Sequence, residues 1–217
     1  AAVVGNREVD LHPYVGARAT NTITHGHGLR GKVCVVSGAS RGVGHGIAVR
    51  FGMAGAKVCV LGRSEGMVSW GPGTLSDVVQ QIHAVGGEGL AVPCDLCRPA
   101  DIRTALQRVV DTFGPTIDVL VNNASAHYTF GIEALDEKRF DLISNLNIRG
   151  TFLLTREAIP HMRTSSLPHV LTIAPAPIAD RTWIGVTACY SISKLAMGLL
   201  TAAWSAEFPF AHFNTIW

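Results

Sequence analysis

The chain has 217 residues, of which 47% are hydrophobic and 16% are charged, and its formal net charge is +2. This length fits one domain with a sizeable buried core. So small a charge gives no strong field for nucleic acid or anionic lipid. The uninterrupted apolar runs are much shorter than the ~20 residues that cross a membrane. We therefore expect a soluble domain with no nucleic-acid partner and no membrane span.

Residues 1–30 show no clear periodicity, and we interpret them as an irregular N-terminal arm. The arm contains His25 and His27, for which we expect a solvated role rather than a metal site. No metal ligands are predicted elsewhere in the sequence. The remaining residues, 31–217, are expected to form one domain.

The five cysteines are an odd number, and several lie in apolar surroundings, as Cys34 and Cys59 do. This favours reduced thiols in an intracellular protein over a disulfide framework. Cys94 and Cys97 have the spacing of a redox or zinc pair, but no second pair accompanies them. We expect structural thiols at the end of a strand, with redox or metal chemistry as the alternative.

From Lys32 onward, short β-rich runs alternate with longer helical stretches. Predicted strands cover residues 33–36, 58–61, 90–92, 119–121, 170–173 and 213–217. Predicted helices cover residues 44–54, 74–85, 99–113, 134–162 and 188–207. Continuous apolar strands separated by helices predict an α/β fold with a doubly wound, Rossmann-like parallel sheet. The sequence stops within the sixth strand, so the predicted sheet is truncated after it.

A glycine-rich turn connects the first predicted strand to the first predicted helix. Glycines lack the Cβ atoms that would keep backbone N–H groups away from a pyrophosphate, and the helix directs its positive end at the phosphates. A turn needed only for packing is the alternative. Strand, turn and helix together predict a dinucleotide site. Its expected residues are Gly38, Ser40, Arg41, Gly42, Val43 and Gly44.

The residue after the second strand indicates which dinucleotide is preferred. An acidic residue there would bind the ribose hydroxyls and repel a 2′-phosphate. This chain has Arg63 at that point and Arg41 within the glycine turn, although Glu65 is close by. Two guanidinium groups favour a phosphate dianion, so we predict NADP(H) rather than NAD(H).

Two further segments follow predicted strands at the same edge of the sheet. Asp95 ends the third strand, where it either caps a loop or contacts adenine. Asn122, Asn123 and Ala124 follow the fourth strand, where side-chain amides are expected to tie neighbouring strands together and to bound the nicotinamide ribose. Two asparagines that only form a turn are the alternative.

Tyr190 and Lys194 are four residues apart in a predicted helix, so their side chains share one face. A phenol is a poor base at neutral pH unless its pKa is lowered, and an adjacent ammonium favours the phenolate. A solvated helix face is the alternative for such a pair in isolation. Its place after the fifth strand of a dinucleotide fold favours catalysis.

These motifs together resemble the short-chain dehydrogenase/reductase family over residues 31–217. The resemblance rests on residues 37–44, 122–124, 147–152 and 190–194, which occur in the family's order and spacing. It implies that Tyr190 donates or accepts a proton and that Lys194 lowers its pKa and binds the ribose. Asn147 would hold a water molecule in the proton relay. The implied reaction moves a hydride between nicotinamide and a small or lipid-like carbonyl or alcohol.

The sequence departs from the family pattern at one catalytic position. The family places a serine after the fifth strand to hold the substrate carbonyl, but residues 172–180 contain no serine. Thr172 and Thr182 are the nearest hydroxyl groups, at a different spacing. Loss of one such donor typically costs ~100- to 1,000-fold in rate. A catalytically degenerate homologue, kept as a structural subunit of a larger assembly and still binding nucleotide, is therefore the alternative function.

The resemblance also carries expectations about assembly and compartment. The helices that contain Asn147 and Tyr190 commonly form the family's dimer face, so a homodimer is expected. A partner chain that covers the truncated sheet edge is the other possibility. The expected compartment is the mitochondrial matrix or another organelle lumen, with the cytosol as the alternative.

Overall fold

The computed structural model describes residues 2–4, 7–9, 28–63, 73–174 and 181–216. Its main feature is a six-stranded, all-parallel sheet in the order β5-β4-β3-β6-β7-β8. The strands are β3 (Val33–Ser37), β4 (Lys57–Gly62), β5 (Glu88–Pro93), β6 (Val119–Asn122), β7 (His169–Ile173) and β8 (His212–Ile216). The helical elements are α1 (Gly42–Met53), α2 (Leu75–Ala84), α3 (Pro99–Phe113), α4 (Glu137–Ile143), the π-helix η2 (Ser144–Gly150), α5 (Thr151–Met162) and α6 (Arg181–Glu207).

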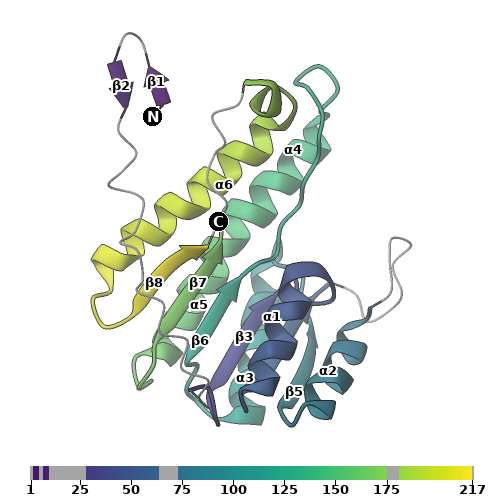
Figure 1. Cartoon of the computed structure of the whole chain (residues 1–217), viewed down its shortest axis with the longest axis vertical. Coiled ribbons are helices and arrows are strands. Elements are labelled where there is room, and N and C mark those ends of the chain that lie inside the picture. Colours follow the sequence, from purple (N-terminus) through teal and green to yellow (C-terminus); the bar gives the residue numbers. More distant parts are fainter. Residues whose placement is uncertain (1, 5–6, 10–27, 64–72, 175–180, 217) are drawn as a thin grey trace.

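Helices cover both faces of the sheet, as Figure 1 shows. Alternate residues of the central strand β3 enter two separate cores. Cys34 and Val36 pack with buried residues of α1 and α2, whereas Val33 and Val35 pack with those of α3, α5 and α6. A strand buried on both faces has no polar side to alternate with, which explains its continuous apolar sequence. The predicted doubly wound fold is confirmed.

The strand order reverses direction between β3 and β6, which are neighbours in the sheet but not in the sequence. In such sheets ligands bind in the crevice outside the carboxyl ends of the strands at this switch point. The glycine turn follows β3, and residues 123–125 follow β6. The topology therefore places two of the predicted site segments side by side.

Local signals explain where two of the surface helices begin. The hydroxyl of Thr74 accepts a hydrogen bond from the N–H of Asp77, and the Asp77 carboxylate accepts one from the N–H of Thr74. This capping box satisfies two free N–H groups at the start of α2. Pro99 begins α3, where its missing N–H is not needed.

Three segments differ from the sequence-based expectation. The arm expected to be irregular contains two short antiparallel strands, β1 (Ala2–Val4) and β2 (Arg7–Val9). The helical stretch predicted over residues 134–162 is divided by the π-helix η2. The helix α6 begins at Arg181 rather than Ala188 and has non-helical angles at Thr187. His25, His27 and Glu65 lie outside the described residues.

Within the described residues, α6 is the one helix whose length and apolar composition would suffice to cross a membrane. This stretch is not an uninterrupted apolar run, because Lys194 lies within it. Several α6 side chains are nevertheless buried within the domain, among them Lys194, Met197 and Trp204. Core helices of globular domains share this length and composition.

Candidate cofactor and catalytic site

The glycine turn after β3 has the backbone geometry that its glycines permit. Gly38 and Gly42 have φ values of 63° and 61°, in the left-handed region that favours glycine. A Cβ at Gly38 would lie 2.7 Å from the Cα of Ala124, so this position also requires glycine for a close approach. At Gly42 a Cβ would meet nothing within 4 Å and would point into open space. The N-cap residue of α1, Arg41, makes no side-chain cap, so the first N–H groups of α1 remain available to an anion.

The turn is tied to the end of β6 by Ser37 and Asn123. The amide of Asn123 donates to the carbonyl oxygens of Ser37 and Gly38, at 2.9 and 3.0 Å. The Ser37 hydroxyl accepts from the N–H groups of Asn123 and Ala124. A Cβ at Gly44 would lie only 2.3 Å from the Asn123 amide nitrogen. The expected tie between strands is therefore made by Asn123.

A cavity of about 170 Å³ opens between the glycine turn, the end of β4 and the end of β6. Among its lining residues are the predicted Gly38, Ser40, Arg41, Arg63 and Ala124. Arg41 and Arg63 are both exposed, and within the described residues neither forms an ion pair. Two unpaired guanidinium groups beside a glycine cradle fit a phosphorylated dinucleotide.

Two other predicted cofactor residues have different surroundings. The Asp95 carboxylate accepts a hydrogen bond from the N–H of Cys97, at 3.0 Å, so it caps the loop, and it also lines a neighbouring cavity of about 620 Å³. Asn122 is buried, and its amide donates to the hydroxyl of Thr155 on α5, at 2.9 Å. The Oδ1 atom of Asn122 has no hydrogen-bond partner among the described residues, and its expected contact with the ribose stays a prediction.

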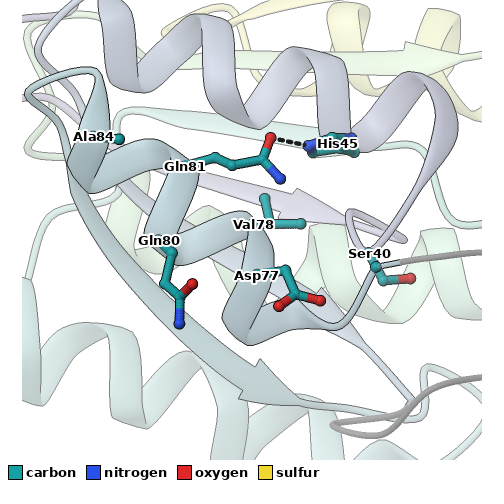
Figure 2. A pocket seen from close by; sticks show the side chains of 8 residues that line it. Ser40, His45, Asp77, Val78, Gln80, Gln81 and Ala84 are labelled. Carbon is teal, nitrogen blue, oxygen red and sulfur yellow. Dashed lines mark hydrogen bonds between the residues drawn. The ribbon is translucent and has the colours of Figure 1, made fainter.

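A second hollow, of about 590 Å³, lies between α1 and α2 (Figure 2). Across it, His45 of α1 and Gln81 of α2 form a hydrogen bond of 2.8 Å. Asp77 and Ser40 also line this hollow. The Asp77 carboxylate would repel a phosphate, so the side of the glycine turn that carries Arg41 and Arg63 suits a phosphate better.

Tyr190 and Lys194 lie on α6 as their spacing predicts. The Lys194 ammonium is 5.7 Å from the centroid of the Tyr190 ring and donates a 2.8 Å hydrogen bond to the carbonyl of Ile173, the last residue of β7. Lys194 is only 4% exposed, and this burial lowers its pKa from 10.5 to about 8. The pair thus faces the carboxyl edge of the sheet rather than solvent.

The pKa of Tyr190 is raised, mainly because burial disfavours the charged phenolate. A hydrogen bond from the side chain of Ser125 acts in the opposite direction. This differs from the expectation that Lys194 lowers the pKa of Tyr190: in the structure, desolvation of the phenol dominates. The ring of His127 packs edge-on against Tyr190 with 4.5 Å between centroids. Neither Ser125 nor His127 is among the residues predicted for the site.

Asn147 is fully buried within the π-helix and connects two parts of the site. Its oxygen accepts from the N–H of Ala126 at 2.7 Å, and its amide donates to the carbonyl of Ala126 at 3.0 Å. The same amide donates to the hydroxyl of Ser193 at 2.9 Å. Both N–H groups of its amide therefore hold the loop after β6 against α6. Its expected part in a proton relay through water stays a prediction.

The structure also shows what the nearby hydroxyl groups do. Thr172 is buried and accepts a 2.9 Å hydrogen bond from Thr201. Thr201 is eleven residues beyond Tyr190 on α6, which corresponds to about 16 Å along the helix axis. The residue after β7 is Ala174, which is buried, and residues 175–180 lie outside the described part of the chain. Thr172 is thus unable to replace the family's serine. Thr182 lies on the far side of the Thr187 irregularity.

The spaced cysteines have the character of structural thiols. Cys94 is buried just after β5, and burial raises its pKa to about 12. Burial likewise raises the pKa of Cys97. A thiol that stays protonated at neutral pH is a poor nucleophile and a poor metal ligand, which supports the structural interpretation.

Comparison with known proteins agrees with this geometry. A family model described as short chain dehydrogenase matches residues 32–211. Hydroxysteroid dehydrogenase-like protein 2 of Danio rerio is 33% identical over 180 residues, which cover 83% of this chain and 43% of that protein. The chain therefore spans less than half the length of this curated relative.

Solved structures show the same fold. A short chain dehydrogenase from Mycobacterium thermoresistibile has a TM-score of 0.81 and 35% identity, covering 87% of this chain and 67% of the other. A metagenomic short-chain oxidoreductase in complex with NADP has a TM-score of 0.74 and 29% identity, covering 86% and 80%. An NADH-dependent reductase complexed with NAD has a TM-score of 0.74 and 26% identity, covering 87% and 78%. The chain belongs to the short chain dehydrogenase family.

Proposed function

We propose that this protein is an NADP(H)-dependent oxidoreductase that interconverts a small or lipid-like carbonyl compound and its alcohol, with Tyr190 as the acid and base. The observation that carries the proposal is the continuity of the site. The cavity beside the glycine turn is lined by Ser125, and the ring of His127, two residues further on, packs edge-on against Tyr190. One short loop after β6 thus connects the predicted phosphate cradle to a phenol that can exchange a proton.

The chain's own residues account for binding and proton transfer. Arg41, Arg63 and the N–H groups at the start of α1 would hold the phosphates, and Lys194 would hold the nicotinamide ribose. Bound NADPH would supply the hydride. When the hydride reaches the carbonyl carbon, the Tyr190 hydroxyl gives its proton to the carbonyl oxygen, and the resulting phenolate is stabilised by the Lys194 ammonium. Alcohol oxidation would be the reverse of these steps.

The test is direct observation of turnover. Purified protein with NADPH and phenanthrenequinone, a reactive apolar dicarbonyl, should lose the absorbance of reduced nicotinamide in proportion to enzyme concentration. If the absorbance of reduced nicotinamide stayed constant with phenanthrenequinone and also with aliphatic ketones, that result would contradict the proposal.

A second candidate function is a structural subunit that binds nucleotide but does not turn it over. Two observations favour it. Ala174 follows β7, in the region where the family has its serine, and the pKa of Tyr190 is raised. This function predicts that NADPH binds, that no carbonyl compound is reduced, and that the protein co-purifies with a larger assembly.

The cofactor preference gives a separate prediction. Replacing Arg63 by alanine should weaken NADPH binding by ~10- to 100-fold, because a charge-assisted hydrogen bond to the 2′-phosphate is worth ~1.5–3 kcal/mol. NADH binding should change much less. Dissociation constants from quenching of tryptophan fluorescence would measure both, with Arg103→Ala on the exposed side of α3 as the matched control. Equal weakening of the two cofactors would show that Arg63 does not read the 2′-phosphate.

We also propose that two copies of the chain pack through α6. Ile192, Leu195 and Leu199 follow one another at helical spacing, and all three are exposed. Changing Leu195 and Leu199 together to glutamate should convert a dimer of 23.1 kDa chains to a monomer in light scattering coupled to gel filtration. Ile132→Glu, at a residue that is 90% exposed, is the control and should leave the mass unchanged. A wild-type protein that is monomeric would contradict this proposal.

A further inference from the structure

The family's serine has no counterpart in residues 172–180, yet reduction of a carbonyl still leaves an oxygen that develops negative charge. One hydrogen-bond donor besides Tyr190 would stabilise that oxygen. The donor must be a hydroxyl beside the Tyr190 phenol, accessible from the cofactor cavity and held in place. Thr172 fails these conditions because it is buried against Thr201.

Ser125 meets each of these conditions. It lies in the loop after β6, is exposed, and lines the cavity next to the glycine turn. The loop brings it close to Tyr190: the ring of His127, two residues further on, packs against the Tyr190 ring with 4.5 Å between centroids, and the Ser125 side chain acts on the pKa of Tyr190. Its hydroxyl makes a long contact, 3.4 Å, to the carbonyl of Ala126. A hydroxyl with such weak competing bonds can turn its proton toward a substrate oxygen.

The loop that carries Ser125 is also held in place by hydrogen bonds from Asn147. The buried Asn147 makes two hydrogen bonds to the main chain of Ala126, the next residue, and one to Ser193, three residues beyond Tyr190. The Ser193 hydroxyl in turn donates to the carbonyl of Tyr190, at 2.7 Å. One buried amide thus fixes both the loop that carries Ser125 and the helix turn that carries Tyr190. Donors fixed in advance are those that stabilise a transition state most effectively.

We propose that Ser125 is a catalytic residue whose hydroxyl, together with that of Tyr190, binds the carbonyl oxygen of the substrate in place of the family's serine. This inference rests on the proposed oxidoreductase function. The Ser125 hydroxyl forms only a hydrogen bond: the hydride still comes from the cofactor and the proton from Tyr190. Asn147 is a positioning residue that holds the two hydroxyl groups together.

The main test compares Ser125→Ala with Ser125→Thr in reduction of phenanthrenequinone by NADPH. Loss of a donor that acts in the transition state should lower kcat by ~100- to 1,000-fold with little change in KM. Ser125→Thr, which keeps the hydroxyl, should recover most of the activity. NADPH affinity and the circular dichroism spectrum should stay as in the wild type. Ser205→Ala, at the exposed far end of α6, is the matched control and should be fully active.

A second measurement does not depend on turnover. The chain has three tyrosines, so the titration of Tyr190 is the difference in tyrosinate absorbance between a protein and its Tyr190→Phe version. Because the hydrogen bond from Ser125 lowers the pKa of Tyr190, Ser125→Ala should raise that pKa and Ser125→Thr should not. Ser205→Ala should leave it unchanged.

The outcomes separate this inference from the function on which it rests. Full activity of Ser125→Ala, in a protein that Tyr190→Phe inactivates, would overturn the role of Ser125 and leave the oxidoreductase function standing. An unchanged Tyr190 titration in Ser125→Ala would overturn it as well. Absence of turnover by the wild type would defeat both.

Discussion

Replacing Tyr190 by phenylalanine is expected to lower kcat/KM for carbonyl reduction by ~100- to 10,000-fold, the range that general acid catalysis contributes. The substitution removes one hydroxyl and keeps the ring. The ring's edge-on contact with His127 and its position over the Lys194 ammonium should therefore persist. The expected loss is specific to the proton-transfer step.

NADPH binding should remain within about threefold of the wild-type value, because no cofactor contact is assigned to the phenol. Stability should also change little, since Tyr190 is only half-buried and the substitution keeps its ring. Single-turnover kinetics, in which preformed protein–NADPH complex is mixed with phenanthrenequinone, would measure the chemical step directly. Tyr128→Phe is the control, since the Tyr128 ring packs near Phe130 and Arg139. Unimpaired reduction by Tyr190→Phe would remove Tyr190 from the mechanism.

The sequence predicts the sheet and most of its helices because their signals are local. The helix over residues 99–113 has its predicted bounds, since Pro99 marks the start and Gly114 the end. Each predicted strand of the parallel sheet is found within two residues of its expected limits. The glycine turn likewise depends on a short run of residues and on the strand and helix beside it.

Features that depend on tertiary contacts were not predictable in this way. Residues 181–187 include β-branched residues and Gly185, which have low helix propensity. Their helix is supported by contacts such as the stack of Trp183 on His127 and the hydrogen bond from Thr187 to the Trp183 carbonyl. The π-helix is centred on Asn147, whose side chain bonds to residues 21 and 46 positions away.

The site shows the same division. The pairing of Tyr190 with Lys194 follows from helical spacing alone. The approach of Ser125 to Tyr190, which are 65 positions apart, depends on the positions of β6 and α6 in the fold. The continuous motif at residues 122–125 offered one usable signal: a hydroxyl directly after the Asn-Asn-Ala segment at a strand's carboxyl end. Burial of the Lys194 ammonium has no local signal, because charged residues on helix faces are usually solvated.

Because the Lys194 ammonium is buried, Lys194 is expected to lower the free energy of unfolding by an amount that depends on pH. The pKa of Lys194 is 10.5 in ordinary surroundings and about 8 in the folded chain, because burial disfavours the ammonium. Below pH 8 both the folded and the unfolded chain bind the proton, and the folded chain bears the cost of the buried charge. Between about pH 8 and pH 10.5 the unfolded chain still binds a proton that the folded chain has lost. Lys194 therefore adds stability as the pH rises through this window, and that stability is lost as the pH falls back to 8.

Lys194→Met removes the titrating group and keeps a flexible chain of similar length. The free energy of unfolding of the variant minus that of the wild type should be largest below pH 8 and should decrease by about 3 kcal/mol on approach to pH 10.5. Other titrating groups are common to both proteins and cancel in this difference. Urea unfolding followed by circular dichroism across the window would measure it.

Lys138→Met, at an exposed residue of α4, is the matched control for removal of a lysine. A flat difference for Lys194→Met would show that the ammonium is not desolvated. The same variant should lose carbonyl reduction, since the phenolate of Tyr190 would lack its neighbouring charge. In the wild type, kcat/KM should fall as the pH rises above about 8, where Lys194 loses its proton. Charged Lys194 lowers the stability of the fold, and uncharged Lys194 no longer supports catalysis. A lysine that is kept in spite of its cost in stability is expected where activity depends on it.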